Sequence, residues 1–104
     1  NRCPQYAGIC IAYGAMLHAA LALIFERTGR LPRTHKGTSR ELHRLARSEL
    51  GLDPQLLVEL SKTYVIKEVA DYGTAPNQVS LDTARRAISN AESFISQVRR
   101  ILSA

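Results

Sequence analysis

The longest uncharged stretch of the chain, residues 3–25, restricts its possible folds most strongly. It contains no Asp, Glu, Lys or Arg, and 17 of the 20 residues from Tyr6 to Phe25 are apolar. A run of about 20 apolar residues is long enough to cross a membrane. However, much of its apolar content is alanine, and Gly8, Gly14 and His18 interrupt it. We therefore predict the central helix of a soluble helical bundle, with Gly29 as its C-terminal stop, and not a membrane span.

Three further helices are expected from apolar residues that recur three or four positions apart. The second begins at residue 38 or 39 and is closed by Gly51, and the third begins after Asp53 as N-cap and ends near Tyr72. A loop over residues 74–79 leads to Ser80, the expected N-cap of the last helix. The last helix has the clearest apolar stripe of the chain: Ala84, Ala87, Ile88, Ala91, Ile95, Val98 and Leu102.

No useful length of the chain alternates with period two, so strands are not expected. At 104 residues, the chain has room for one domain, residues 1–104. We predict an all-α, antiparallel up-and-down bundle of four helices. The last helix carries more apolar surface than the short second helix can cover. This surplus points to a fifth helix before residue 1 or to a partner chain.

The net charge of +5 comes from one segment. Residues 27–47 hold seven of the fourteen Lys and Arg residues but only one acid, Glu41. The rest of the chain is close to neutral. The positive charge therefore points to a local anion-binding surface and excludes a histone-like polycation.

Within this segment, Arg40, Arg44 and Arg47 share one face of the second helix, and Lys36 joins them if that helix starts early. Because no acid lies among these arginines on that face, we expect mutual repulsion without pairing inside the helix. Such a face favours a bound anion, namely RNA phosphate, a nucleotide or an acidic partner protein. The alternative is an ordinary solvated helix face. Arg30 and Arg33 continue the positive charge into the preceding connector.

His35 lies among these cations, which disfavour its protonated form. A neutral imidazole there could accept a proton beside phosphate-binding groups. Alternatively, His35 braces the following helix. No pair of histidines has the spacing of metal ligands, and no phosphate-binding glycine loop is present, so we expect no metal site and no cofactor.

Four landmarks resemble a known family. Residues 12–20 (AYGAMLHAA), 32–37 (PRTHKG) and 68–73 (EVADYG), followed by Val79-Ser80 before an alanine-rich helix, occur in this order. They resemble the small stand-alone branch of the HEPN domain family. The resemblance implies a helical bundle of about five helices, usually dimeric, whose first helix would precede residue 1.

HEPN proteins often pair with a small nucleotidyltransferase as toxin and antitoxin, and many are metal-independent ribonucleases. Their motif is an Arg followed after four to six residues by His, near the end of the equivalent of the third helix. Here that position reads Lys67 to Tyr72, with Lys67 in place of the Arg and no His. Arg30 and His35 have the required spacing, but they lie in the connector.

We therefore expect a cytoplasmic, homodimeric HEPN domain that binds RNA or nucleotide, with a degenerate ribonuclease motif. It would belong to a toxin–antitoxin or nucleotidyltransferase-associated system and not to a membrane. The alternative is a non-catalytic dimerisation or protein-interaction module. The expected anion-binding residues are Arg33, Lys36, Arg40, Arg44 and Arg47. If the chain is an enzyme, His35 transfers the proton and Arg30 or Lys67 contacts the phosphate, with Asp71 and Tyr72 nearby.

Overall fold

The computed structural model of the chain describes residues 4–48, 51–72 and 79–103. These residues form four helices and no strand, which confirms the all-α bundle. The helices are α1 (Pro4–Thr28), α2 (His35–Ala46), α3 (Pro54–Tyr72) and α4 (Leu81–Ser103). The loop predicted over residues 74–79 lies outside the described residues except for Val79.

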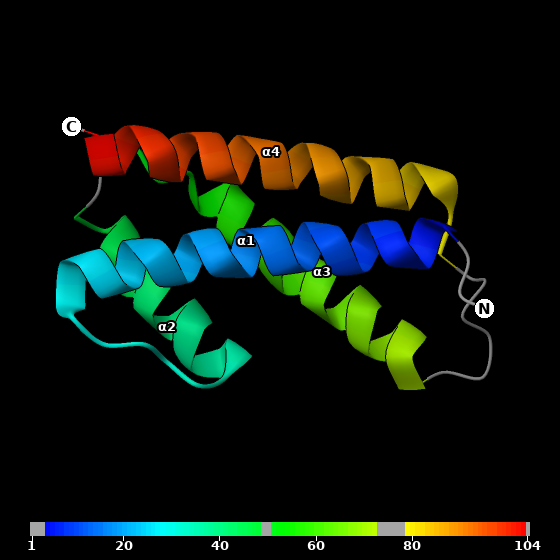
Figure 1. Ribbon diagram of the computed structural model, residues 1–104, viewed down its shortest axis with the longest axis horizontal. Coiled ribbons are helices and arrows are strands. Elements are labelled where there is room, and N and C mark those ends of the chain that lie inside the picture. The colour runs from blue at the N-terminus through cyan, green and yellow to red at the C-terminus, as the bar shows by residue number, and fades with distance from the viewer. Residues whose placement is uncertain (1–3, 49–50, 73–78, 104) are drawn as a thin grey trace.

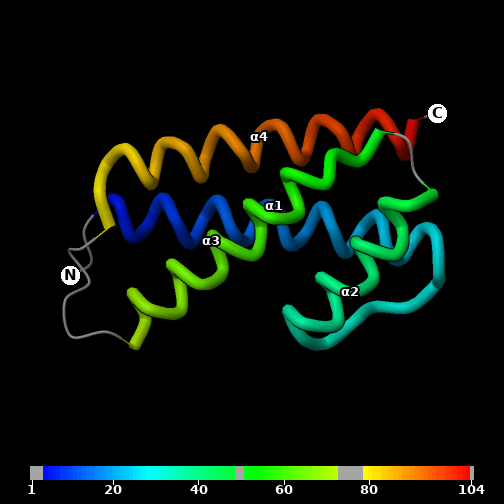
Figure 2. Tube along the Cα trace, turned by 180° about the vertical axis from the view of Figure 1, so that it is seen from behind, coloured from blue at the N-terminus to red at the C-terminus, as the bar shows by residue number. Residues whose placement is uncertain are grey.

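The two long helices, α1 and α4, lie side by side and run in the same direction (Figure 1). Helix α3 crosses them obliquely in the opposite direction, as the view from behind also shows (Figure 2). The connector between α1 and α2 runs back along the bundle before α2 begins. Strict up-and-down alternation is therefore limited to α2, α3 and α4. This return of the connector brings the start of α2 towards α3.

Helix α1 is central, since it packs against each of the other three helices. Ile9, Met16 and Leu23 of α1 are fully buried, as is Phe94 of α4. Helix α1 is also long and apolar enough to cross a membrane by length and composition alone. In the structure, however, one side of it forms the core, in agreement with the predicted central helix.

Local hydrogen bonds confirm three of the predicted helix ends. Gly29 has a φ of +73° and donates its N–H to the Phe25 carbonyl at 2.8 Å, which ends α1. Asp53 accepts from the backbone N–H of Gln55 at 2.9 Å. Ser80 accepts from the backbone N–H of Thr83 at 3.0 Å. The side chains of Asp53 and Ser80 thus satisfy amide groups at the N-termini of α3 and α4.

The predicted start of α2 at residue 38 or 39 is wrong, because the helix begins at His35. Thr34 is its N-cap, and the Thr34 hydroxyl accepts from the Gly37 N–H at 3.0 Å. Thr38, which is buried, donates its own hydroxyl to the Thr34 carbonyl at 2.9 Å. This early start places His35 and Lys36 in the first turn of α2, so Lys36 joins the arginine face.

Candidate nucleic-acid interface

An open depression of about 550 Å³ lies along α2. It is lined by cationic, imidazole and hydroxyl groups, namely His35, Lys36, Ser39, Arg40, His43, Arg44 and Arg47. We call it the basic depression. Lys36, Arg40 and Arg47 form no ion pair with an acid of the described chain. Three uncompensated cations therefore share one surface, which is the electrostatic pattern of a phosphate-binding site.

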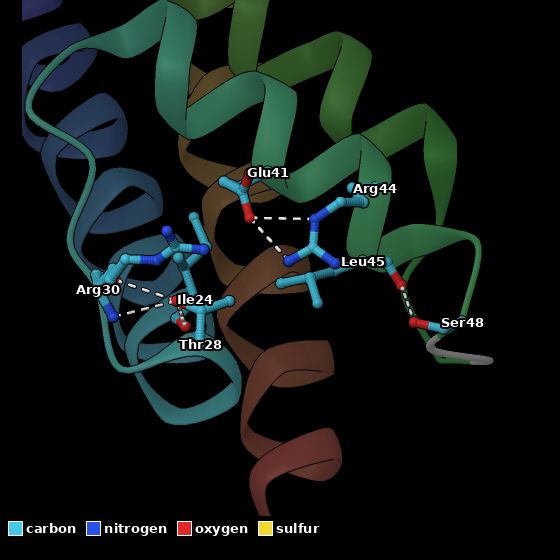
Figure 3. A network of polar contacts seen from close by, with 7 residues as sticks. All are labelled: Ile24, Thr28, Arg30, Glu41, Arg44, Leu45 and Ser48. Atoms are coloured by element: carbon cyan, nitrogen blue, oxygen red, sulfur yellow. Dashed lines mark hydrogen bonds and ion pairs between the residues drawn. The ribbon is translucent and has the colours of Figure 1, made fainter.

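The expectation that these arginines lack a helical partner is wrong for Arg44. Glu41 precedes it by three residues, and one Glu41 carboxylate oxygen accepts from Arg44 Nη2 at 2.8 Å and from Nε at 3.2 Å (Figure 3). This hydrogen bond lowers the pKa of Glu41, with smaller contributions from Arg30 and Arg40. The pair is exposed, so it fixes the direction of the Arg44 guanidinium more than it stabilises the fold.

One end of the basic depression adjoins an aromatic cluster formed by Tyr13, His35 and Tyr64. The rings of His35 and Tyr64 are stacked, with centroids 3.9 Å apart and planes 5° apart. The Tyr13 hydroxyl lies 2.9 Å from Nδ1 of His35. The cluster thus joins the first turn of α2 to α1 and α3, in agreement with the bracing role considered for His35.

The buried Tyr13 and His35 share a hydrogen bond whose direction follows the tautomer of His35. Burial raises the pKa of Tyr13 to about 12, so its phenol keeps its proton. The phenol donates to Nδ1 when the neutral ring carries its proton on Nε2, and it accepts from Nδ1 when the ring carries its proton there. Only the second tautomer leaves Nε2 able to act as a general base.

Burial also lowers the pKa of His35, and the Glu68 carboxylate opposes this shift. Neutral His35 is therefore favoured by folding, and its contribution to stability is complete above the unfolded-state value of 6.5. That contribution is lost as the pH falls through the lower, folded-state pKa. The titratable groups that face His35 are Tyr13 from α1 and Tyr64 and Glu68 from α3.

We expect the protein to be less stable in urea at pH 5.5 than at pH 7.5, with part of this loss due to His35. His35→Asn keeps an acceptor for Tyr13 but cannot titrate, so it should reduce the dependence of the unfolding midpoint on pH. His18→Asn, at an exposed histidine of α1, is the matched control and should keep the wild-type dependence. An unchanged pH dependence in His35→Asn would contradict the assignment.

The structure places the other predicted residues of the connector apart from His35. Arg30 lines a separate, smaller depression together with Thr28, Leu31 and Glu41. Its backbone N–H donates to the Thr28 hydroxyl at 3.1 Å (Figure 3). Arg40 lines both depressions, whereas Arg33 is exposed and lines neither. Arg30 and His35 are thus not brought together in one depression.

The predicted residues at the end of α3 form a different group. Lys67 Nζ lies 2.7 Å from an Asp71 carboxylate oxygen, and the Tyr6 hydroxyl donates to the other oxygen. This network joins the start of α1 to the end of α3 and compensates the charge of Lys67. Tyr72 is 82 % exposed. Glu68, one residue after Lys67, acts on His35 and Tyr64 of the aromatic cluster, and Tyr72 makes a smaller contribution to the raised pKa of Tyr64.

Sequence reasoning missed Tyr13, Tyr64, Glu68 and His43 as parts of this surface. The first three reach His35 only through contacts between helices, for which a local pattern carries no signal. His43, however, could have been found, since residues 36, 40, 43 and 47 recur along one helical face. Within the described ranges, no group of three or more His, Cys, Asp or Glu residues could hold a metal ion.

The fold defines an all-α class of helical-bundle domain, and the basic depression is its candidate anion-binding surface. The HEPN domain family matches residues 5–101 of the chain. A UPF0332 protein of Archaeoglobus fulgidus is 36% identical over 88 residues, which cover 85% of this chain and 68% of the relative. No solved structure matches the chain. The chain therefore belongs to the HEPN domain family.

Proposed function

We propose that this HEPN domain binds single-stranded RNA, or the phosphates of a nucleotide, through the basic depression. The observation that carries the proposal is that Lys36, Arg40 and Arg47 share one depression with no paired acid among the described residues. Arg44 adds a fourth cation whose guanidinium is held by Glu41. When such cations contact RNA phosphates, counterions bound to the RNA are released. This release gives affinity without sequence preference.

His35 supports this proposal in a second way. In the tautomer that carries its proton on Nε2, it provides a neutral hydrogen-bond donor beside the cations, and such donors bind phosphate oxygens. Stacking on Tyr64 holds the ring, so the direction of Nε2 is set before the ligand arrives. The wider setting that we propose is a cytoplasmic homodimer of a toxin–antitoxin or nucleotidyltransferase-associated system. Membership of the HEPN family supports this setting.

The salt dependence of RNA binding tests the proposal. With three or four phosphates contacted, the slope of log affinity against log salt is expected to be about −2 to −3, at about −0.7 per phosphate for a single strand. Fluorescence anisotropy of a labelled oligouridine at several salt concentrations measures this slope. No binding at the lowest salt, or affinity that salt does not change, would refute the proposal.

A non-catalytic interaction module is the second candidate, because α3 exposes an apolar stripe. Val58, Val65, Val69 and Tyr72 lie on one face of α3 and are 42 to 82 % exposed. Such a stripe suits a second copy of the chain or a partner protein such as a small nucleotidyltransferase. This candidate predicts that the protein self-associates but has no RNA affinity at low salt. Sedimentation and anisotropy on the same sample therefore separate the two candidates.

A further inference from the structure

A second open depression, of about 520 Å³, lies between α2 and α3 and shares His43 with the basic depression. We call it the apolar depression, since its lining from α3 is mainly Leu57, Val58, Val65 and Ile66. Ser61 and Lys62 complete it. Among the described residues that line either depression, none is acidic. The two depressions therefore form one continuous surface that is cationic at one end and apolar at the other.

His43, where the two depressions meet, has a fixed hydrogen-bonding pattern. Its Nδ1 lies 2.8 Å from the backbone carbonyl oxygen of Ser39. A carbonyl oxygen only accepts, so Nδ1 carries the proton and donates it. In the neutral ring, Nε2 then bears the lone pair and accepts hydrogen bonds. The junction between the cationic and the apolar end is thus marked by a hydrogen-bond acceptor.

The apolar depression presents its side chains to solvent instead of closing over them. Val58 is 42 % exposed and Val65 is 57 % exposed. A flat aromatic ring laid on such a surface removes apolar area from water without any rearrangement of the helices. Lys62 lines the edge of this surface, and its Nζ lies 3.8 Å from a Glu59 carboxylate oxygen that compensates its charge. The apolar end of the surface therefore carries no uncompensated cation, which suits an uncharged base.

The order of these groups matches the order of groups in one nucleotide. A nucleotide has an anionic phosphate, then a sugar with hydroxyl donors, then a flat base. The surface has cations, then the acceptor Nε2 of His43, then the apolar depression. An isolated phosphate would use only the first part, and a free apolar ligand only the last.

We propose that the two depressions together bind one ribonucleotide unit of an RNA chain. Its phosphate is one of the several phosphates that contact Lys36, Arg40 and Arg47, and a ribose hydroxyl donates to Nε2 of His43. Its base rests on Val58 and Val65. This inference rests on the proposed function, to which it adds a site for the base and a contact that distinguishes RNA from DNA.

Two oligonucleotides with the same phosphate number separate the parts of this site: oligouridine and an abasic oligoribonucleotide of equal length. The wild-type protein should bind the abasic strand about tenfold more weakly, because the abasic strand cannot bury the apolar area that a base removes from water on Val58 and Val65. Val58→Ser with Val65→Ser should weaken oligouridine binding to the abasic level and leave abasic binding unchanged. Val69→Ser, at an exposed valine of α3 outside both depressions, is the matched control and should have no effect.

Equal wild-type affinity for the two strands would overturn the inference while leaving salt-dependent RNA binding intact. Failure of both strands to bind at low salt would overturn the inference and the proposed function together. Affinity for an acidic amphipathic peptide but for neither strand would assign the surface to a protein partner and would also overturn the inference.

The contact at His43 is tested with oligodeoxyuridine, which lacks the 2′-hydroxyl. The wild-type protein should prefer oligouridine over oligodeoxyuridine, and His43→Leu should lose this preference. His43→Gln, whose amide can place an oxygen near the position of Nε2, should restore part of it. If His43→Leu keeps the full preference for RNA, the hydroxyl contact is wrong.

Discussion

Substitution of lysine for Met16 is expected to unfold the protein. Met16 has no exposed surface and lies at the middle of α1, among the core residues of the bundle. A lysine there would bury a charge with no acid to pair with, or would need to lose its proton, and either costs several kcal/mol. We expect a loss of more than about 4 kcal/mol, close to the whole stability of a domain of this size. Urea unfolding followed by circular dichroism measures this loss.

The matched control is Ile11→Lys, because Ile11 is 69 % exposed on the same helix. It adds the same charge at a solvated position, so the helical signal and the unfolding midpoint should stay close to those of the wild type. The pair also tests the surroundings of α1. In a bilayer, lysine at the centre of a spanning helix costs about 3 kcal/mol on every side of the helix. Equal damage by the two substitutions would therefore contradict a helix with one buried and one solvated side.

The sequence alone is sufficient to predict those helix boundaries at which a residue gives a strong local signal. Gly29 ends α1 because a residue at φ +73° is strained unless it is glycine. Asp53 and Ser80 begin α3 and α4 because their short side chains accept from backbone N–H groups of the first turn. These signals act over a few residues, so they do not depend on how the helices pack.

The errors arise where a local pattern competes with packing or with a second signal. The sequence pattern places the start of α2 too late, because Gly37 is typical of a connector. In the structure, Thr34 is the N-cap of α2 and Gly37 lies in its first turn. In α4, Phe94 and Ile101 are buried instead of Ile88 and Leu102, which are exposed. The predicted stripe has the right period and shares Ala84, Ala87, Ala91 and Val98 with the buried face, but the centre of the buried face lies to one side of the centre of the stripe. The packing of α4 against α1 determines which residues of α4 are buried. This packing cannot be predicted from the sequence of α4 alone.

The candidate site was predictable only in part. The cations of α2 follow from helical spacing, and His35 stands out because it lies among these cations in the sequence. The partners of His35 did not follow, because Tyr13 is 22 residues away and reaches it only after α1 and α2 pack. The same reason explains Tyr64 and Glu68, which approach from α3. Charge on one helix can be predicted from the sequence, whereas a hydrogen bond or ring contact from another helix cannot.

The combined substitution of Arg40, Arg44 and Arg47 by glutamine is expected to abolish most of the RNA affinity. Each phosphate contact contributes about 0.7 to the salt exponent for a single strand, which is close to tenfold in affinity at about 50 mM salt. Loss of three contacts should therefore weaken oligouridine binding by about two to three orders of magnitude and reduce the salt slope by about 2. Anisotropy titrations of the wild type and the variant over the same salt series measure both quantities.

Arg86, Arg99 and Arg100 provide the matched control, since they are exposed on α4 and line neither the basic nor the apolar depression. Their substitution by glutamine changes the net charge by the same amount. If RNA is held by net charge alone, the two triple variants lose affinity equally, and the basic depression is not the binding site. If the depression binds RNA, the α4 variant keeps nearly the full slope, because the released counterions come from contacts and not from distant charge.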